Sequence, residues 1–260
     1  MILLTVFLAI VSITFAAPAK PTLKVECNDK ECEIVGNFEV PQDLIREGDI
    51  LENFIESRNA LTNDRKLWKD GIVPYVYHKI ITPPSRAKIE NAMRLLEEQT
   101  CVKFVPWDES MGEHYLMVLA NDGCFATVGF SRLNQRYLNL NQRGCLYYLG
   151  SIQHELLHVL GLEHEQSRPD RDEHVTILKE NIETGMEKQF KIVGGREYST
   201  LDVPYDYNSV MHYSAYSFSK NRKATLLPKD PNVDPETLGQ RKGAAESDIK
   251  KINIMYKCNK

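Results

Sequence analysis

Residues 154–165 read HELLHVLGLEHE, a stretch that decides both the expected fold and the expected chemistry. On a helix, residues four apart lie on one face, so His154 and His158 can direct two imidazoles at one ion. Gly161 can adopt a positive φ at little steric cost and end the helix, which lets His164 approach the same ion from another direction. Three neutral nitrogens and one open position are typical of a catalytic zinc site, whereas structural zinc sites are usually closed by four protein ligands.

A glutamate and a downstream methionine complete the pattern. Glu155 is the residue type that can take the proton of a zinc-bound water and pass it to the leaving amine of a peptide, since zinc lowers the pKa of that water to about 7. A bare His-Glu-x-x-His also occurs in amphipathic helices whose histidines serve packing, and the third histidine after a glycine argues against that alternative. The extended pattern is a metalloprotease signature when a methionine turn follows it, and residues 209–213 read SVMHY.

The composition of the chain is that of a globular protein. Its 260 residues are enough for one or two domains with a sizeable core. Hydrophobic residues make up 42% and charged residues 26%, which are ordinary values for a soluble fold. The formal net charge of -4 gives no reason to expect a nucleic-acid partner.

The first residues predict export. Residues 1–17 hold a nearly continuous apolar run followed by small residues, which is typical of a secretory signal peptide, although no basic side chain precedes the run. Cleavage after Ala16, Ala17 or Ala19 fits the pattern. An uncleaved membrane anchor is the alternative, but the run is short for a span and prolines follow it. We therefore expect a secreted, extracellular protein whose mature form has no membrane anchor.

Six cysteines agree with an oxidising compartment. Cys27 and Cys32 lie near the N-terminus. Their spacing of five residues, without neighbouring histidines, argues against a zinc-binding or redox-active pair. The other four cysteines allow three pairings, between which the residues alone do not choose: Cys101, Cys124, Cys145 and Cys258.

Hydrophobic periodicity predicts strands before the histidine motif and few regular elements after it. Residues 18–58 are polar and charge-rich and look too poor in apolar side chains to form a core of their own. Within one of the strand-like runs, Pro74 favours an edge position or the end of the strand. The strand-like runs are 72–77, 102–105, 115–120 and 137–140. Apolar residues at helical spacing predict helices at 85–100, 150–160 and 246–256.

The chain resembles the astacin family of zinc metalloendopeptidases, within the metzincins. Glu165 follows the third histidine, at the position that separates the metzincin branches, and glutamate is the astacin choice. Residues 166–172 continue the family sequence closely, and Met211-His212-Tyr213 is the astacin form of the methionine turn. Three further segments are similar to the family: 124–129, 238–241 and 252–256. The resemblance covers 59–260 and leaves no room for the CUB or EGF-like modules that follow the protease in many relatives.

The resemblance implies an α+β fold with two lobes and a cleft between them. The N-terminal lobe would hold a twisted sheet and two helices, the second of which carries the metal site, and the C-terminal lobe would be mostly irregular. The implied domains are a signal peptide at 1–17, a propeptide at 18–58 and an astacin-like catalytic domain at 59–260. The implied disulfides are Cys101–Cys258 and Cys124–Cys145.

The resemblance also assigns roles within the methionine turn. Tyr213 would be an extra zinc ligand in the resting enzyme and would then swing away to stabilise the negative charge of the reaction intermediate. A packed aromatic side chain is the alternative for this residue. Met211 would form the floor beneath the metal, as a flexible core residue without chemistry. The remaining histidines are expected to be surface or packing residues: His78, His114, His174 and His212.

A propeptide would keep such an enzyme inactive. In the family, an aspartate after a glycine reaches the zinc in place of the catalytic water, and Gly48-Asp49 matches that pattern. We therefore expect Asp49 to be a zinc ligand in the zymogen only, with a surface turn as the alternative. The family usually has an aromatic residue two positions before the glycine, where this chain has Arg46.

Activation would need a cut by another protease. The expected cleavage is Arg58-Asn59, with Arg65 and Lys66 as competing sites. The resemblance implies that the new ammonium group is buried near Glu165, since a buried amine needs a carboxylate partner.

The resulting hypothesis is a secreted zinc-dependent endopeptidase, made as a zymogen, with one Zn²⁺ per subunit and protein or peptide substrates. A binding protein that keeps the fold without catalysis is the first alternative, and an intact Glu155 argues against it. A different metzincin branch is the second, in which Cys27 or Cys32 would block the zinc. Glu165 and Tyr213 argue against that branch, and a titration of free thiols separates the two.

Substrate identity does not follow from the residues. Many astacins prefer an acidic residue just after the cut, and three basic residues are candidates for the corresponding pocket: Lys220, Arg222 and Lys223.

Overall fold

The computed structural model describes residues 23–28, 31–36, 40, 44–52, 67–132, 135–193 and 200–259. The expected signal peptide at 1–17 and the expected cleavage site Arg58-Asn59 lie outside these described residues. Where the structure describes the chain, no helix is both long and apolar enough to cross a membrane.

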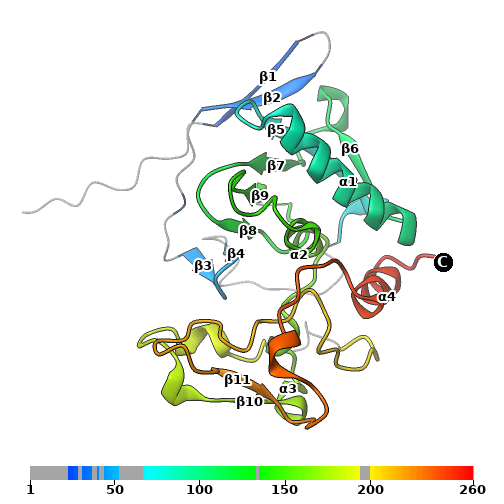
Figure 1. The fold of residues 1–260 in the computed structure, drawn as a ribbon. Helices are drawn as coiled ribbons and strands as arrows, with labels where there is room; N and C mark the ends of the chain where they lie inside the picture. The colour runs from blue at the N-terminus through cyan, green and yellow to red at the C-terminus, as the bar shows by residue number, and fades with distance from the viewer. Residues whose placement is uncertain are drawn as a thin grey trace, which may run out of the picture.

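Within the described residues, a nine-stranded mixed sheet forms the upper half of the molecule in Figure 1, in the order β1-β2-β5-β7-β9-β8-β4-β3 with β6 also paired to β5. Strands β5, β6, β7 and β9 run parallel to one another, and β8 runs antiparallel to β9. The four predicted strands are confirmed, whereas β8 was missed because it is only three residues long. The central strands are β5 (Ile72–His78), β6 (Lys103–Pro106), β7 (Leu116–Leu119), β8 (Cys124–Ala126) and β9 (Arg136–Leu140).

Strand β5 continues through its proline, contrary to the expectation that Pro74 marks an edge or an end. Pro74 pairs with Val105 of β6, whereas the ladder to β7 begins only at Tyr75. A proline has no backbone N–H to donate. Pro74 is tolerated inside β5 because the ladder to β7 starts one residue later, at Tyr75.

Two helices cover one face of this sheet. Helix α1 (Pro83–Gln99) begins with two prolines, which are pre-organised for a helix start, and it packs against α2 (Leu149–Val159). Both helices contribute to the main core, together with alternate residues of β5 such as Val73 and Tyr75. Val76 points to the opposite face, where a smaller apolar cluster lies. The predicted helices at 85–100 and 150–160 are confirmed within a residue or two.

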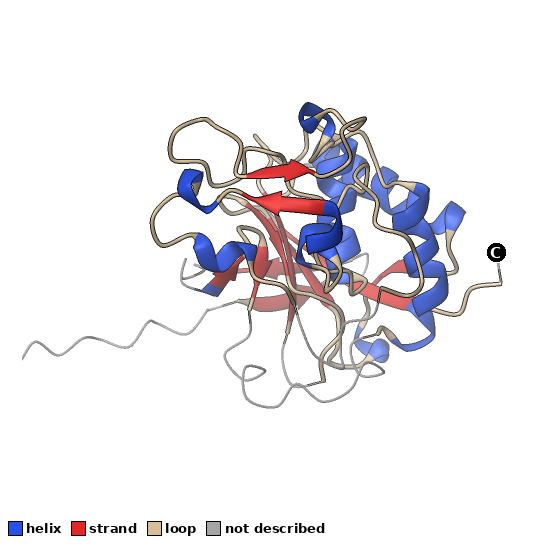
Figure 2. Cartoon of the chain, turned by 90° about the horizontal axis from the view of Figure 1, so that it is seen from below, coloured by secondary structure: helices blue, strands red, loops and turns tan. Residues whose placement is uncertain are grey.

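The C-terminal half has little regular structure, as the resemblance implied. Figure 2 shows the strands running through the middle of the molecule and the longer helices gathered to one side. The elements after α2 are α3 (Arg171–His174), β10 (Val175–Ile177), β11 (Leu226–Pro228) and α4 (Glu246–Met255), with β10 and β11 antiparallel. Short 3-10 turns lie in this half at Glu165–Ser167, Lys179–Asn181, Glu187–Phe190 and Pro235–Thr237. Two more lie before α2, at Lys69–Gly71 and Glu109–Met111.

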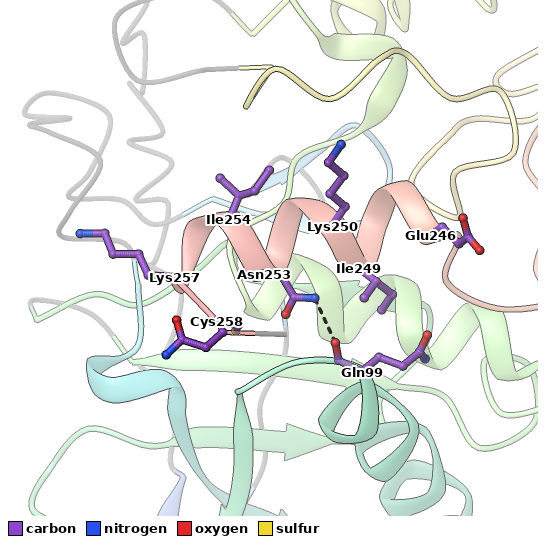
Figure 3. A pocket seen from close by; sticks show the side chains of 9 residues that line it. Gln99, Glu246, Ile249, Lys250, Asn253, Ile254, Lys257 and Cys258 are labelled. Carbon is purple, nitrogen blue, oxygen red and sulfur yellow. Dashed lines mark hydrogen bonds between the residues drawn. The ribbon is translucent and has the colours of Figure 1, made fainter.

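The last helix is fixed to the N-terminal half near the end of α1. The Asn253 side chain donates a hydrogen bond of 3.0 Å to the backbone oxygen of Gln99, as Figure 3 shows for the surface pocket beside α4. A disulfide joins Cys101 to Cys258, directly after α4. A second disulfide joins Cys124 to Cys145. Both pairs are those that the family resemblance implied.

The N-terminal segment adds strands to both ends of the sheet. The hairpin β1 (Lys24–Cys27) and β2 (Cys32–Val35) is closed by a disulfide and pairs with β5. The hairpin β3 (Ile45–Arg46) and β4 (Ile50–Leu51) pairs with β8 at the other end, as Figure 1 shows. Ile34 and Ile50 are buried against the rest of the chain. The segment therefore extends the sheet and the core of the main domain, in agreement with the expectation that it has no core of its own.

Candidate metal centre

Helix α2 and the turn after it position the three motif histidines. Nearly every residue of α2 is buried, so the helix is held on several sides. Gly161 ends it with φ 109°, and the amides of Gly161 and Leu162 donate back to the oxygens of His158 and Leu157. This left-handed turn satisfies the last helical carbonyls. It reverses the chain direction so that residue 164 returns to the helix, as the sequence predicted.

The three histidines and Asp49 meet at one point. Each of the four residues offers a ligand atom, and these atoms all lie within 4.8 Å of one another. The His154 and His164 Nε2 atoms are 3.3 Å apart, and Asp49 Oδ2 lies 3.0 Å from His154 Nε2. Ligand atoms about 2.0–2.1 Å from a tetrahedral zinc are themselves about 3.3 Å apart. The spacing therefore fits one zinc ion.

The hydrogen bonds of the histidines decide which nitrogens face the centre. The Nδ1 atoms of His154 and His158 lie 2.7 Å from the backbone oxygens of Val210 and Leu162. A carbonyl can only accept, so both rings donate from Nδ1, and in the neutral ring this leaves the Nε2 lone pair for a metal. His164 does the same, with its Nδ1 2.8 Å from a Glu47 carboxylate oxygen. Three lone pairs and a carboxylate converge, which is stable only around a cation.

Unpaired buried atoms at the same point support this conclusion. Among the described residues, Asp49 Oδ1, Glu155 Oε2 and His158 Nε2 are buried without a hydrogen-bond partner. A buried polar atom without a partner costs about 1–3 kcal/mol. Coordination of a metal would satisfy His158 and Asp49, and the donor set of nitrogens and carboxylate oxygen is one that zinc accepts.

Burial sets the charge states around the centre. Burial lowers the pKa of His154, and burial followed by the charges of His164 and His154 lowers the pKa of His158 well below its usual range. Burial alone would raise the pKa of Asp49, but the adjacent His164 and His154 hold it well below its usual range. Burial and then the charge of Asp49 raise the pKa of Glu155 well above its usual range. Metal binding needs deprotonated ligand atoms, and the lowered pKa values of His154, His158 and Asp49 favour those forms.

The methionine turn is hydrogen-bonded to the residues of the centre, through His154 to Val210 and through Glu165 to Met211. Met211 is buried, and its backbone oxygen accepts from the amide of Glu165 at 3.0 Å. Tyr213 is also buried, but its hydroxyl donates to the backbone oxygen of Glu47 at 2.6 Å. In this form the Tyr213 hydroxyl is thus engaged by the N-terminal segment. Its expected zinc ligation stays a prediction for the form that lacks this segment.

The other described histidines make packing contacts instead. His212 is fully buried, donates from Nδ1 to the oxygen of Tyr213 at 2.7 Å, and accepts from the Tyr205 hydroxyl at 2.7 Å. His174 stacks on the Tyr205 ring, and His78 bonds to the backbone oxygen of residue 36. His114 packs edge-on against an aromatic ring. None of the four belongs to the ligand cluster among the described residues.

The hairpin loop that carries Asp49 has a conformation that its sequence allows. Gly48 has φ 86°, and a Cβ built on it would lie 2.9 Å from Phe218 Cζ. Glycine is therefore required both for the backbone angle and for the close approach. The backbone oxygen of Asp49 accepts from the amide of Ala126 at 2.8 Å, which fixes the loop to β8. Arg46, which stands where the family has an aromatic residue, forms an ion pair with Glu163 at 2.7 Å.

Two residues near the third histidine were missed at the sequence level. Glu47 is buried and contacts His164 and Ser167. Lys251 of α4 forms a buried ion pair with Glu165, which also pairs with Arg168 at 3.0 Å. No local sequence pattern marks either residue, because each contacts a partner that is far away along the chain. The expected ammonium partner of Glu165 begins at Asn59, outside the described residues.

Two further expectations concern charge and thiols. Lys220, Arg222 and Lys223 lie on an exposed loop, and their role in substrate preference stays a prediction. Cys27 and Cys32 are joined in a disulfide, so neither offers the free thiol that a cysteine-blocked zinc site would need.

Comparisons with known proteins place this geometry in context. The family model described as Astacin, a peptidase family, matches residues 60–257. The chain is 37% identical to zinc metalloproteinase nas-4 of Caenorhabditis elegans over 238 residues, covering 88% of this chain and 72% of that protein. It is 42% identical to embryonic protein UVS.2 of Xenopus laevis over 222 residues, covering 82% of this chain but only 40% of the relative.

A solved structure also has a similar fold. High choriolytic enzyme 1 of Oryzias latipes, a hatching enzyme zinc-protease, superposes with a TM-score of 0.66 and 34% identity. The match covers 81% of this chain and 100% of that structure. The two-lobed α+β fold expected from the sequence is therefore confirmed.

Proposed function

We propose, from the premise that this chain belongs to the astacin family of zinc metalloendopeptidases, that its 260-residue form is a secreted precursor closed by its own N-terminal segment. The chain is a zinc metalloendopeptidase with a site for one zinc ion. The proposed parts are a signal peptide at 1–17, a propeptide at 18–58 and a catalytic domain at 59–260. An activating protease would cut at Arg58-Asn59, and the active form would hydrolyse protein or peptide substrates.

The position of the Asp49 carboxylate carries the proposal of latency. Its Oδ2 atom lies 3.0 Å from His154 Nε2 and 3.2 Å from His164 Nε2. A carboxylate oxygen is an accepted zinc ligand. Asp49 would hold zinc as a fourth protein ligand and would take the place that a catalytic water needs.

The residues of the chain have distinct roles once that position is open. Zinc bound there would supply a water of lowered pKa and polarise the peptide carbonyl. Glu155 is proposed to take the water's proton and pass it to the leaving amine. In the precursor, burial and then the charge of Asp49 raise the pKa of the Glu155 carboxyl well above its usual range, and loss of Asp49 removes the second influence. Tyr213, freed from the oxygen of Glu47, is proposed to donate a hydrogen bond to the negatively charged intermediate.

Asp49→Ala in the full-length chain tests this proposal. All variants would carry Arg58→Gln, and mass spectrometry would show that the chain stays intact. We expect the uncut Asp49→Ala chain to hydrolyse a quenched fluorescent peptide library while the uncut parent does not. Glu52→Gln is the matched control, because Glu52 is an exposed carboxylate at the end of the same hairpin, and that variant should remain inactive.

A second variant separates latency from the hydrolytic chemistry. Asp49→Ala combined with Glu155→Gln should bind zinc but leave the peptide library uncut. If Asp49→Ala is folded, zinc-bound and as inactive as the parent, Asp49 alone does not account for latency, because Glu47 still holds the Tyr213 hydroxyl in the uncut chain. Secretion is checked independently by N-terminal sequencing of the exported chain, which should begin just after residue 16, 17 or 19.

A further inference from the structure

We propose that Glu47 is a positioning residue for the metal centre: its carboxylate holds His164 in the orientation and tautomer that zinc binding requires. The N-terminal segment would then do more than block the centre, because it would also complete it. The inference rests on the proposed precursor, since Glu47 lies in the segment that activation is proposed to remove. It follows that zinc is held more tightly before that removal than after it.

The three histidines differ in what holds their second nitrogen. His154 and His158 donate to the backbone oxygens of Val210 and Leu162, which belong to the catalytic domain. These partners are main-chain atoms of the domain itself, so they stay when the segment leaves. His164 instead donates to a carboxylate that comes from the N-terminal segment. The third ligand is therefore oriented by a part of the chain that is not proposed to persist.

The Glu47 carboxylate is built into its position. The residue is 3% exposed, and Oε2 accepts a second hydrogen bond, of 2.7 Å, from the Ser167 hydroxyl. Its other oxygen pairs with Arg46. The Glu47 amide donates to the Gln189 side chain at 2.7 Å, and its backbone oxygen accepts from Tyr213. A buried carboxylate with this many partners has one orientation, which is what positioning a ligand requires.

A carboxylate behind a ligating imidazole has a known physical effect. Accepting the Nδ1 proton fixes the tautomer, keeps the ring from rotating, and makes the other nitrogen a better donor to the metal. The loss of such a partner typically lowers metal affinity about 10–100-fold. The carboxylate is also charge-balanced, because the Arg46 guanidinium lies against it and reaches Glu163 on the far side. Its burial is therefore supported by the same segment.

A simpler role for Glu47 is to dock the segment and so deliver Asp49. Both roles weaken zinc binding when Glu47 is changed, so the experiment must report docking separately. The amide of Ala126 does this, because it donates to the backbone oxygen of Asp49 at 2.8 Å only while the hairpin is in place. Hydrogen-exchange protection of that one amide measures docking without reference to the metal.

The test compares zinc affinities of full-length chains by competition with a chromophoric chelator. Every chain carries Glu155→Gln, so no result depends on hydrolysis, and a failure of the proposed peptidase latency leaves this measurement intact. We expect Glu47→Ala to weaken zinc binding about 10–100-fold while the Ala126 amide stays protected. Glu47→Gln keeps an oxygen that can accept from His164, so its affinity should fall between those of the parent and Glu47→Ala. Glu52 is half-exposed and pairs with Arg46 at 3.0 Å without touching the histidines. Glu52→Gln keeps an oxygen for Arg46, so this control should match the parent within about twofold.

Two results would overturn the inference. One is a Glu47→Ala chain that binds zinc as tightly as the parent with the Ala126 amide protected. The other is weaker binding that always accompanies loss of Ala126 protection, since this would assign Glu47 to docking alone.

Discussion

Asp248 connects the last helix to the methionine turn, and its removal should be among the most damaging single changes in the chain. The side chain is fully buried. One carboxylate oxygen accepts from the Ser209 hydroxyl at 2.6 Å, and the other accepts from the amides of Val210 and Ala245 at 3.0 and 2.9 Å. The Val210 backbone in turn accepts from His154. Asp248 thus supports a ligand of the metal through one intermediate residue.

The cost of Asp248→Ala follows from these contacts. The Val210 amide and the Ser209 hydroxyl are buried, and each would lose an acceptor at about 1–3 kcal/mol. The Ala245 amide is only partly buried and can reach water, so its loss resembles that of a helix cap, about 1 kcal/mol. Together these give about 3–7 kcal/mol, a large part of the 5–15 kcal/mol that a folded domain typically has.

Asp248→Asn should be far milder. The amide keeps one oxygen for the two backbone donors, and its NH₂ group can donate to the Ser209 hydroxyl. Burial raises the pKa of Asp248 despite its hydrogen bonds, so the negative charge contributes little that a neutral amide loses. We expect a loss of about 1 kcal/mol.

Urea unfolding of the zinc-loaded, disulfide-intact chains measures these differences. Glu246→Ala is the matched control, because Glu246 lies in the first turn of the same helix but is exposed, and it should change the free energy of unfolding by about 0.5 kcal/mol or less. Zinc affinity of Asp248→Ala should also fall, because the acceptor of His154 is displaced. The reasoning is refuted if Asp248→Ala unfolds within about 1 kcal/mol of the parent, or if Asp248→Asn is as damaging as Asp248→Ala.

Two further predictions concern the turn after α2 and the buried histidine of the methionine turn. Gly161→Ala should lower the free energy of unfolding by about 1–3 kcal/mol and weaken zinc binding. The reason is that φ of Gly161 is 109° and the new Cβ would lie 3.0 Å from Met255 Cε. An unchanged urea midpoint would contradict this prediction. Burial lowers the pKa of His212 to about 4, from an ordinary value of 6.5. Between these pH values the unfolded chain binds more protons, so this contribution to stability is complete above about pH 6.5 and is lost as the pH falls toward 4. Imidazole ¹⁵N shifts should show His212 neutral at pH 5, and a half-protonated ring at pH 6 would refute the assignment.

The parts of the structure that could be predicted from the sequence are marked by patterns within short segments of the chain. Helix α2 and its histidines follow from a four-residue spacing and from Gly161, all within twelve residues of chain. Strand β5 and helix α1 follow from apolar periodicity over seven or more residues. In each case the pattern and the structure that it specifies occupy the same short segment, so no knowledge of distant contacts is needed.

The parts that were missed depend on partners far along the chain. Strands β3 and β4 have two residues each, and they are strands only because β8 provides a neighbour. Glu47 meets His164 across 117 positions and Lys251 meets Glu165 across 86. A buried acidic or basic residue in a polar segment has the same local pattern as an exposed one. Its function therefore becomes visible only when the fold places its partner beside it.

Three consecutive residues in the turn after α2 receive partners from opposite ends of the chain. Glu163 and His164 are bound by Arg46 and Glu47 of the N-terminal segment, whereas Glu165 is bound by Lys251 of α4.

The proposed removal of the N-terminal segment would therefore remove the Glu47 contact of His164, whereas Glu165 would keep its ion pair with Lys251. The first two ligands keep their backbone acceptors, and Tyr213 loses its acceptor on Glu47 at the same step. Among the residues at the metal centre, a rearrangement on activation should then involve His164 and Tyr213. Because His154 and His158 stay fixed on a buried helix, the zinc position itself should be nearly the same in the closed and the open form.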